Sequence, residues 1–125
     1  MKKIIILIPV YNDWESLKNL IEEINENIKV INDIDFECLV VNDASTTSAP
    51  VIKKPSKFQS IEILNMKKNK GHARCNAFGI RYVFQNKDFD YLILMDGDGE
   101  DRPSEIKNLV EKINENPKIS VVAKR

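Results

Sequence analysis

The sequence predicts an α/β fold: an open, mostly parallel, Rossmann-like sheet with helices on both faces. Short apolar runs rich in β-branched residues alternate with segments in which apolar residues recur at helical spacing. The first apolar run is nearly continuous, which is typical of a strand buried on both faces of a parallel sheet. Alternating strands and helices imply crossover connections, so the strands are expected to be parallel and their carboxyl ends to share one edge.

The amino-terminal half alternates strand, helix and strand. Residues 3–9 are too few for a helix and rich in Ile, so they predict a strand. Asn12 can cap a helix from about residue 13 to residue 29, because Leu and Ile recur there at helical spacing. A second strand, residues 36–41, ends in a cluster of turn formers. The two prolines within 50–55 leave room only for a short or irregular helix before the next strand.

The carboxyl-terminal half repeats this alternation. Residues 60–66 predict a third strand, a helix begins at Gly71, and residues 89–95 predict a fourth strand. Pro103 suits the first turn of another helix. Residues 118–123 predict a fifth strand, which completes one domain spanning the whole chain.

The composition argues against several classes of protein. The 125 residues include 19 basic and 19 acidic side chains, so no net charge favours nucleic acid or an anionic membrane. No apolar run approaches the roughly 20 residues of a transmembrane helix, and the amino terminus lacks a signal-peptide cleavage pattern. Cys38 and Cys75 fall in apolar or helical segments, as expected of buried thiols in a reducing compartment. We expect a cytoplasmic domain, 1–125, without a nucleic-acid partner.

Four polar loops are expected at the shared edge, because each follows a predicted strand. They read PVYND, NDAS, MKKNKGH and DGDGED. Ligands of open α/β sheets bind in the crevice outside the carboxyl ends of the strands. The sequence therefore predicts a ligand site built from these loops.

The DGDGED loop carries the most distinctive chemistry. Asp96 and Asp98 are two residues apart, so in an extended segment their carboxylates point to the same side. Such a pair favours a hard divalent cation, Mg²⁺ or Mn²⁺, which keeps coordination positions open for phosphate oxygens. A solvated turn is the alternative interpretation, since Asp-Gly is a common turn pair.

Three other acidic motifs fit this chain less well. An EF-hand loop beginning at Asp96 requires Gly and Glu where Asp101 and Lys107 stand. A receiver-like phospho-acceptor domain expects an acidic pair after its first strand, where this chain has PVYN. A haloacid-dehalogenase-type phosphatase normally carries Asp-x-Asp after its first strand, and here the motif follows the fourth.

Taken together, four motifs resemble those of family 2 glycosyltransferases of the GT-A fold, which use nucleotide sugars. IPVYND resembles the family's Pro-x-Tyr-Asn-Glu, VVNDAST its Val-Val-Asp-Asp-Gly-Ser-Thr, and NKGHARCNAFGI its Asn-x-Gly helix start. LMDGDGEDRPSEI resembles its metal loop, most of all that of the dolichol-phosphate and polyprenyl-phosphate sugar transferases. The order and spacing of the motifs agree along essentially the whole chain.

The resemblance implies a site for a UDP- or GDP-linked sugar and a divalent metal, Mg²⁺ or Mn²⁺. Asn42 departs from the family's Asp and brings no charge, whereas Glu100 replaces a Gln and adds one. Asp43 is expected to accept a hydrogen bond from the base. The nucleotide-binding positions are Pro9, Tyr11, Asp13, Asn42, Asp43, Gly71 and Asp96, and the metal positions are Asp96, Asp98 and Glu100.

Several of these residues also have a purely structural interpretation. Asn12 is expected to cap the first helix, and Asp13 can favour the positive end of that helix. Tyr11 can pack at the rim of the site, and Asp43 can shape a turn. The sequence leaves both interpretations open.

The expected function is transfer of a sugar from a nucleoside-diphosphate sugar to an acceptor such as a polyprenyl phosphate or a saccharide, in glycan or cell-wall biosynthesis. In the family the acceptor surface follows the fifth strand. The chain therefore resembles only the amino-terminal, nucleotide-sugar-binding part, truncated there and inactive in transfer by itself. The resemblance also implies peripheral association of the full-length enzyme with the inner face of the membrane. The alternatives are an Asp-x-Asp phosphatase or phosphotransferase and a non-catalytic nucleotide-binding module.

Overall fold

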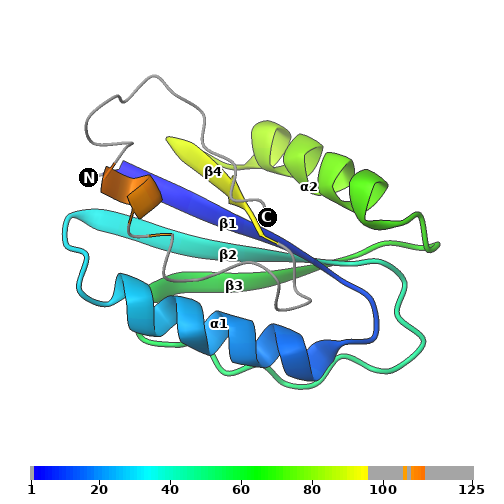
Figure 1. The fold of residues 1–125 in the computed structure, drawn as a ribbon. Coiled ribbons are helices and arrows are strands. Elements are labelled where there is room, and N and C mark those ends of the chain that lie inside the picture. Colours follow the sequence, from blue (N-terminus) through cyan, green and yellow to red (C-terminus); the bar gives the residue numbers. More distant parts are fainter. Residues whose placement is uncertain (1, 96–105, 107, 112–125) are drawn as a thin grey trace.

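A computed structural model describes residues 2–95, 106 and 108–111. Within these residues, four strands form one sheet in the order β3-β2-β1-β4, and every neighbouring pair is parallel (Figure 1). The expected open parallel α/β fold is thereby confirmed. The strands are β1 (Lys2–Val10), β2 (Ile34–Asn42), β3 (Phe58–Asn65) and β4 (Tyr91–Leu94).

Strand β1 is the centre of the sheet, because it pairs with β2 on one side and with β4 on the other. Its register with β2 runs from Lys2↔Ile34 to Val10↔Asn42. Every residue of β1 after Lys3 is buried. Burial on both faces explains why this strand reads as an unbroken apolar run, with no polar alternation.

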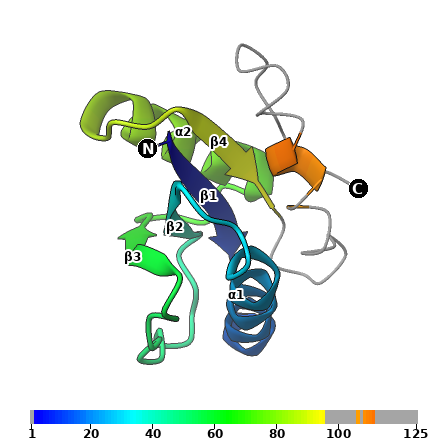
Figure 2. The same cartoon turned by 90° about the vertical axis from the view of Figure 1, so that its left-hand side faces the viewer.

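Helix α1 (Trp14–Ile28) covers one face of the sheet (Figure 2). Its apolar side chains pack in one cluster with the even-numbered side chains of β1. Ile106 and Val110 join the same cluster, so the helical residues 106 and 108–111 lie on this face as well. The buried residues of α1 are Trp14, Leu17, Leu20, Ile21, Ile24 and Ile28.

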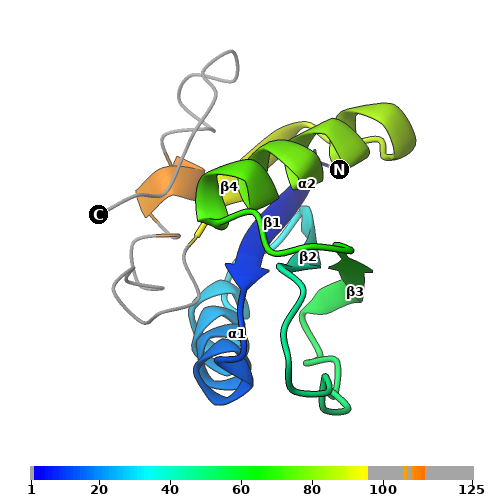
Figure 3. The same ribbon diagram turned by 90° about the vertical axis from the view of Figure 1, so that its right-hand side faces the viewer.

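Helix α2 (His72–Asn86) covers the opposite face, and it begins at Gly71 as expected (Figure 3). Gly79 is where the helix approaches the sheet most tightly. A Cβ atom at this position would lie 2.6 Å from Leu7 Cδ1 and 2.9 Å from Val41 Cγ2. Both atoms belong to core side chains of neighbouring strands, so only glycine fits here without a shift of the helix.

The order of the strands reverses between β1 and β4. The chain steps from β1 to β2 to β3 in one direction and then returns to the far side of β1 for β4. Right-handed crossovers in opposite directions place α1 and α2 on opposite faces, as observed. The carboxyl ends of β1 and β4 therefore flank the topological switch point, where open α/β sheets bind ligands.

Some sequence expectations require correction. The short helix expected within 50–55 is not present, because these residues have no regular structure; prolines lack an N–H group and restrict the residue before them. Strands β2 and β3 each begin two residues earlier than expected, and β4 begins two residues later. Phe89 packs edge to face on Phe84, with ring centroids 5.1 Å apart, instead of starting β4. The expected fifth strand and Pro103 lie outside the described residues.

A polar network joins β3 to the carboxyl end of α2. The Tyr82 hydroxyl donates a hydrogen bond to Glu62, and the Lys87 ammonium lies 2.9 Å from the same carboxylate. Burial raises the pKa of Glu62, but the hydrogen bonds from Tyr82 and Lys87 and the charge of Lys87 outweigh it, so the pKa falls below its ordinary value of 4.5. The hydrogen bond to Glu62 raises the pKa of Lys87 above 10.5, although burial opposes this change.

Gly79→Ala is expected to lower the free energy of unfolding by about 1–2 kcal/mol, because overpacking outweighs the better helix propensity of Ala. Urea denaturation followed by circular dichroism measures the change. Gln85→Ala on the exposed side of α2 is the control and should change stability by less than about 0.5 kcal/mol. A Gly79→Ala variant as stable as the wild type would contradict the tight packing of α2 on the sheet.

Both cysteines are free and buried, as expected. They belong to clusters on opposite faces of the sheet. Burial raises the pKa of Cys38 to about 12, and burial together with the negative charge of Asp43 raises the pKa of Cys75 to about 12. Since the thiolate is the reactive form, both thiols should react with Ellman's reagent at pH 8 at least about 100-fold faster in urea than in the native state. Rapid labelling of either native thiol would contradict its burial.

Glu62→Gln should reveal the charge network through pH. The stabilisation that comes from the Glu62 carboxylate is complete above the ordinary pKa of Glu62, and it is lost as the pH falls through the lowered pKa of Glu62 in the folded state. The stabilisation that comes from the Lys87 ammonium is complete below the ordinary pKa of Lys87, and it is lost as the pH rises through the raised pKa of Lys87 in the folded state. The difference in unfolding free energy from the wild type, about 1 kcal/mol or less, should therefore be constant from about pH 5 to 10 and shrink on either side. Glu22→Gln, exposed on α1, should show no such profile.

Candidate functional site

The loops after three strands meet at the carboxyl edge of the sheet, as the sequence predicted. The loop after β2 begins beside β1, because the Asp43 N–H donates to the Val10 carbonyl at 2.8 Å. The loop after β3 begins beside β2, because the Met66 N–H donates to the Asn42 carbonyl at 2.9 Å. On the other side of β1, the Met95 N–H donates to the Leu7 carbonyl at 3.0 Å. Position 96, where the acidic loop begins in the sequence, follows directly.

Asn12 joins the loop after β1 to the loop after β2. Its N–H donates to Ser45 Oγ at 2.8 Å, and its side-chain Oδ1 accepts the N–H groups of Thr46 and Thr47 at 2.8 and 3.1 Å. Its Nδ2 donates to Thr46 Oγ1 at 3.1 Å. The expectation that Asn12 caps α1 was wrong. The capping position is Asp13, and α1 has no side-chain cap hydrogen bond.

Asn42 occupies the position at which the family motif has an Asp, at the end of β2. Its Oδ1 accepts the Ser45 N–H at 3.0 Å, and its Nδ2 donates to Asn65 Oδ1 at 2.9 Å. One end of the amide is thus held by the loop that follows β2, and the other end is held by the last residue of β3. The side chain is partly exposed, and Nδ2 keeps a second hydrogen with which it can donate to another group.

Asp43 fixes the start of α2. The carboxylate accepts the Lys70 N–H at 2.7 Å on one oxygen and the Gly71 N–H at 3.0 Å on the other. It is the one buried charged side chain in the described part of the chain, with 1% exposure. Gly71 has φ +85°, a conformation that glycine adopts at little cost. A negative charge at the amino end of a helix is also favourable, so Asp43 has a clear structural role here. The base contact expected from the sequence stays a prediction.

The remaining candidates on β1 and its loop differ in accessibility. Pro9 is buried within the strand, in register with Val41. Tyr11 is 40% exposed, and Asp13 is exposed at the start of α1. The Asp13 N–H donates to the Tyr11 carbonyl at 2.8 Å, which closes a tight turn around Asn12. Tyr11 and Asp13 are therefore the side chains of this loop that a ligand can reach.

The metal site is not described by the structure. Asp96, Asp98 and Glu100 lie outside the described residues, and the role of each stays a prediction. Among the residues that the structure does describe, no group of three His, Cys, Asp or Glu side chains could hold a metal ion.

Two buried polar atoms lie toward the same end of the molecule. Trp14 Nε1, at the start of α1, and Asn76 Oδ1, in the first half of α2, find no hydrogen-bond partner among the described residues. An unsatisfied buried polar atom costs about 1–3 kcal/mol.

Sequence reasoning missed the linking roles of Thr46 and Asn65. A signal was nevertheless present, because the segment NDASTTS is rich in side chains that bond to nearby main-chain groups. What the sequence could not supply is the partner. The Thr46 N–H bonds to a residue 34 positions earlier in the chain.

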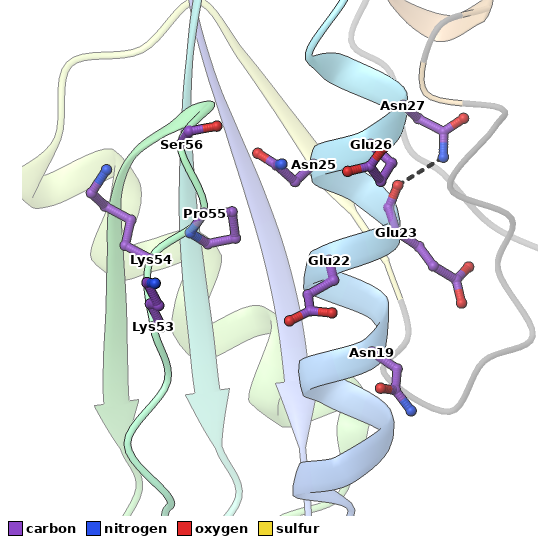
Figure 4. A pocket seen from close by; sticks show the side chains of 10 residues that line it. All are labelled: Asn19, Glu22, Glu23, Asn25, Glu26, Asn27, Lys53, Lys54, Pro55 and Ser56. Atoms are coloured by element: carbon purple, nitrogen blue, oxygen red, sulfur yellow. Dashed lines mark hydrogen bonds between the residues drawn. The ribbon is translucent and has the colours of Figure 1, made fainter.

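A hollow of about 790 Å³ lies away from these loops, between α1 and the segment that precedes β3 (Figure 4). Because α1 runs back from the carboxyl end of β1, this hollow lies toward the amino ends of the strands. It mixes carboxylates of α1 with two lysines and contains none of the predicted site residues. Its lining residues are Asn19, Glu22, Glu23, Asn25, Glu26, Asn27, Lys53, Lys54, Pro55 and Ser56.

No helix in the described ranges combines the length and apolar character needed to cross a bilayer.

Two solved structures share the fold. The chain superimposes on the crystal structure of S. aureus TarS 1-349 with a TM-score of 0.64 and 16% identity, over 94% of this chain and 33% of that one. A second crystal structure of S. aureus TarS gives a TM-score of 0.57 and 20% identity, over 92% of this chain and 20% of that one. The chain thus spans at most a third of either protein, and identities this low establish the fold alone.

Family membership comes from the sequence match. The family model described as glycosyl transferase family 2 matches residues 5–125, which is nearly the entire chain. The match covers the strands, the loops that hydrogen bonds join at the carboxyl edge of the sheet, and the acidic segment. It agrees with the resemblance carried by the four motifs, and the chain belongs to glycosyl transferase family 2.

Proposed function

We propose that this chain binds the donor in a glycosyltransferase that moves a sugar from a nucleoside-diphosphate sugar to an acceptor. The observation that carries the proposal is the set of polar loops fixed to one another beside the topological switch point, in a chain of this family. Open α/β sheets bind nucleotides at that edge. A preorganised polar surface is what recognition of a base and ribose requires.

The accessible loop residues take the direct roles in this proposal. Tyr11 and Asp13 contact the base and ribose from the loop after β1, where both are exposed. Asn42 offers the remaining hydrogen of Nδ2 to a carbonyl oxygen of the base. Pro9, Asp43 and Gly71 support the site from behind: Pro9 is buried within β1, Asp43 holds the start of α2, and Gly71 allows the turn before that helix.

Asp96, Asp98 and Glu100 are the proposed ligands of a divalent cation, Mg²⁺ or Mn²⁺, with Asp96 also close to the ribose. The support is their spacing and their position in the sequence directly after β4. Such a cation offsets the negative charge that builds on a leaving nucleoside diphosphate. The carboxylate of Asp43 accepts the N–H groups of Lys70 and Gly71, directly before α2, so these two amides are engaged and are not available to the diphosphate.

In the proposed reaction an acceptor oxygen attacks the anomeric carbon, the bond from that carbon to the diphosphate breaks, and the nucleoside diphosphate leaves. The acidic loop most resembles that of polyprenyl-phosphate sugar transferases, so we propose a polyprenyl phosphate as the acceptor; a saccharide is the alternative. A lipid acceptor would bring the full-length enzyme to the inner face of a membrane.

Family membership favours the transferase over an Asp-x-Asp phosphatase. A phosphatase would form a phosphoenzyme at Asp96, which mass spectrometry of chain trapped with a phosphate analogue would detect. A non-catalytic nucleotide-binding module would bind the donor without transfer in the full-length protein.

Calorimetric titration of this chain with UDP, GDP and their sugar conjugates, with and without Mn²⁺, tests the proposal. We expect one nucleotide to bind at least about tenfold more tightly with Mn²⁺, a difference of about 1.4 kcal/mol, and Asp98→Ala to remove that gain. Asp88→Ala deletes an exposed carboxylate at the amino end of β4 and should leave binding unchanged. Failure of every nucleotide to bind, or equal loss in both variants, would contradict the proposal.

A further inference from the structure

Asn12 combines an unusual backbone conformation with a place beside an uncapped helix start. Its φ is +62°, in the left-handed region that residues other than Gly, Asn and Asp rarely adopt. It stands two residues before α1, directly before Asp13, which holds the capping position without a side-chain cap hydrogen bond. Departures from local preference cluster at functional sites, where surrounding contacts hold them in place.

The contacts that hold Asn12 all come from one loop. Its main-chain N–H and both ends of its side-chain amide bond to Ser45, Thr46 and Thr47, at distances of 2.8–3.1 Å for the contacts that involve nitrogen. The Thr46 and Thr47 hydroxyls lie 3.3 and 3.2 Å from the same Oδ1. A single side chain thereby satisfies two main-chain N–H groups of a loop that has no regular structure of its own.

The neighbours of Asn12 are the exposed side chains of its loop. Tyr11 precedes it and Asp13 follows it, and the hydrogen bond between their main chains makes the turn tight. In such a turn the conformation of the middle residue sets the directions of the residues on either side. Fixing Asn12 against the next loop therefore fixes where Tyr11 and Asp13 point.

We propose that Asn12 is a positioning residue of the nucleotide site: it clamps the loop after β1 to the loop after β2 and so holds Tyr11 and Asp13 ready for the base and ribose. This inference rests on the proposed function. In this inference Asn12 acts through Tyr11 and Asp13 and not by contact with the nucleotide, because its Oδ1 and one Nδ2 hydrogen are bonded to the loop after β2.

Two substitutions separate the backbone requirement from the side-chain clamp. Asn12→Gly keeps access to positive φ but deletes every side-chain bond. Asn12→Asp keeps both the backbone tolerance and the acceptor oxygen, and loses only the donor to Thr46 Oγ1. Asn27→Ala is the matched control, since it also removes an amide that bonds to main chain, at Glu23 O on an exposed part of α1.

Three measurements are made on each variant: hydrogen exchange of the Thr46 and Thr47 amides, affinity for UDP and GDP with Mn²⁺, and stability in urea. For Asn12→Gly we expect both amides to exchange at least about tenfold faster and the affinity to fall about tenfold, while the variant stays folded. Asn12→Asp should keep slow exchange and bind within about threefold of the wild type at 0.3 M salt, where added charge is screened. Asn27→Ala should change neither exchange nor affinity.

Two contrary results overturn the positioning role of Asn12, and a third overturns the proposed function as well. Unchanged affinity in Asn12→Gly, with or without faster exchange, overturns the positioning role. Weak binding by Asn12→Asp while its amides stay protected overturns it as well, because the Asn12 amide would then touch the nucleotide itself. A wild-type chain that binds neither UDP nor GDP overturns the proposed function and this inference together. The results on the variants overturn only this inference, so the two failures can be distinguished.

Discussion

The pairing of β1 on both of its sides is the constraint on which the rest of the structure depends. Because this strand lies between β2 and β4, its register sets where each neighbour ends. Its even and odd side chains supply the contact surfaces for α1 and α2, respectively. Two of its carbonyl groups also accept hydrogen bonds from the segments that follow its neighbours. The Val10 carbonyl accepts the N–H of Asp43, directly after β2, and the Leu7 carbonyl accepts the N–H of Met95, directly after β4. One buried strand thus determines both the core and the edge where the loops gather.

Three short side chains turn that edge into a single polar surface. Asn12 and Asp43 each accept hydrogen bonds from the main chain of a neighbouring loop. Asn42 donates a hydrogen bond to the side chain of Asn65, at the end of β3. This is possible because parallel strands end at the same level, so a side chain of one or two carbons reaches the next loop. The apolar clusters place the loops to within a few ångströms, and the amides and the carboxylate fix their conformation.

The strands and helices were predictable because their signals are periodic and local. The face of α1, the start of α2 at Gly71 and the burial of both cysteines all follow from spacing along the chain. The role of Asn12 did not follow, since capping is a local preference and its actual partners lie more than 30 residues away. The fold class and family were thus readable from the sequence. The loop contacts required three-dimensional neighbours, and the acidic segment lies outside the described residues.

The central position of β1 also determines the order in which the chain can fold. Strand β4 pairs with β1 across 87 positions, in register from Ile4↔Tyr91 to Leu7↔Leu94. Contacts of such long range form slowly, because closing a large loop costs entropy before the contact repays it. Of the four described strands, β1 is synthesised first, and it gains its second partner only when β4 follows. Until residue 94 has been synthesised, one edge of KIIILIPV is unpaired and can pair with other chains. A chaperone that binds extended apolar segments is therefore expected to bind the nascent chain at this strand.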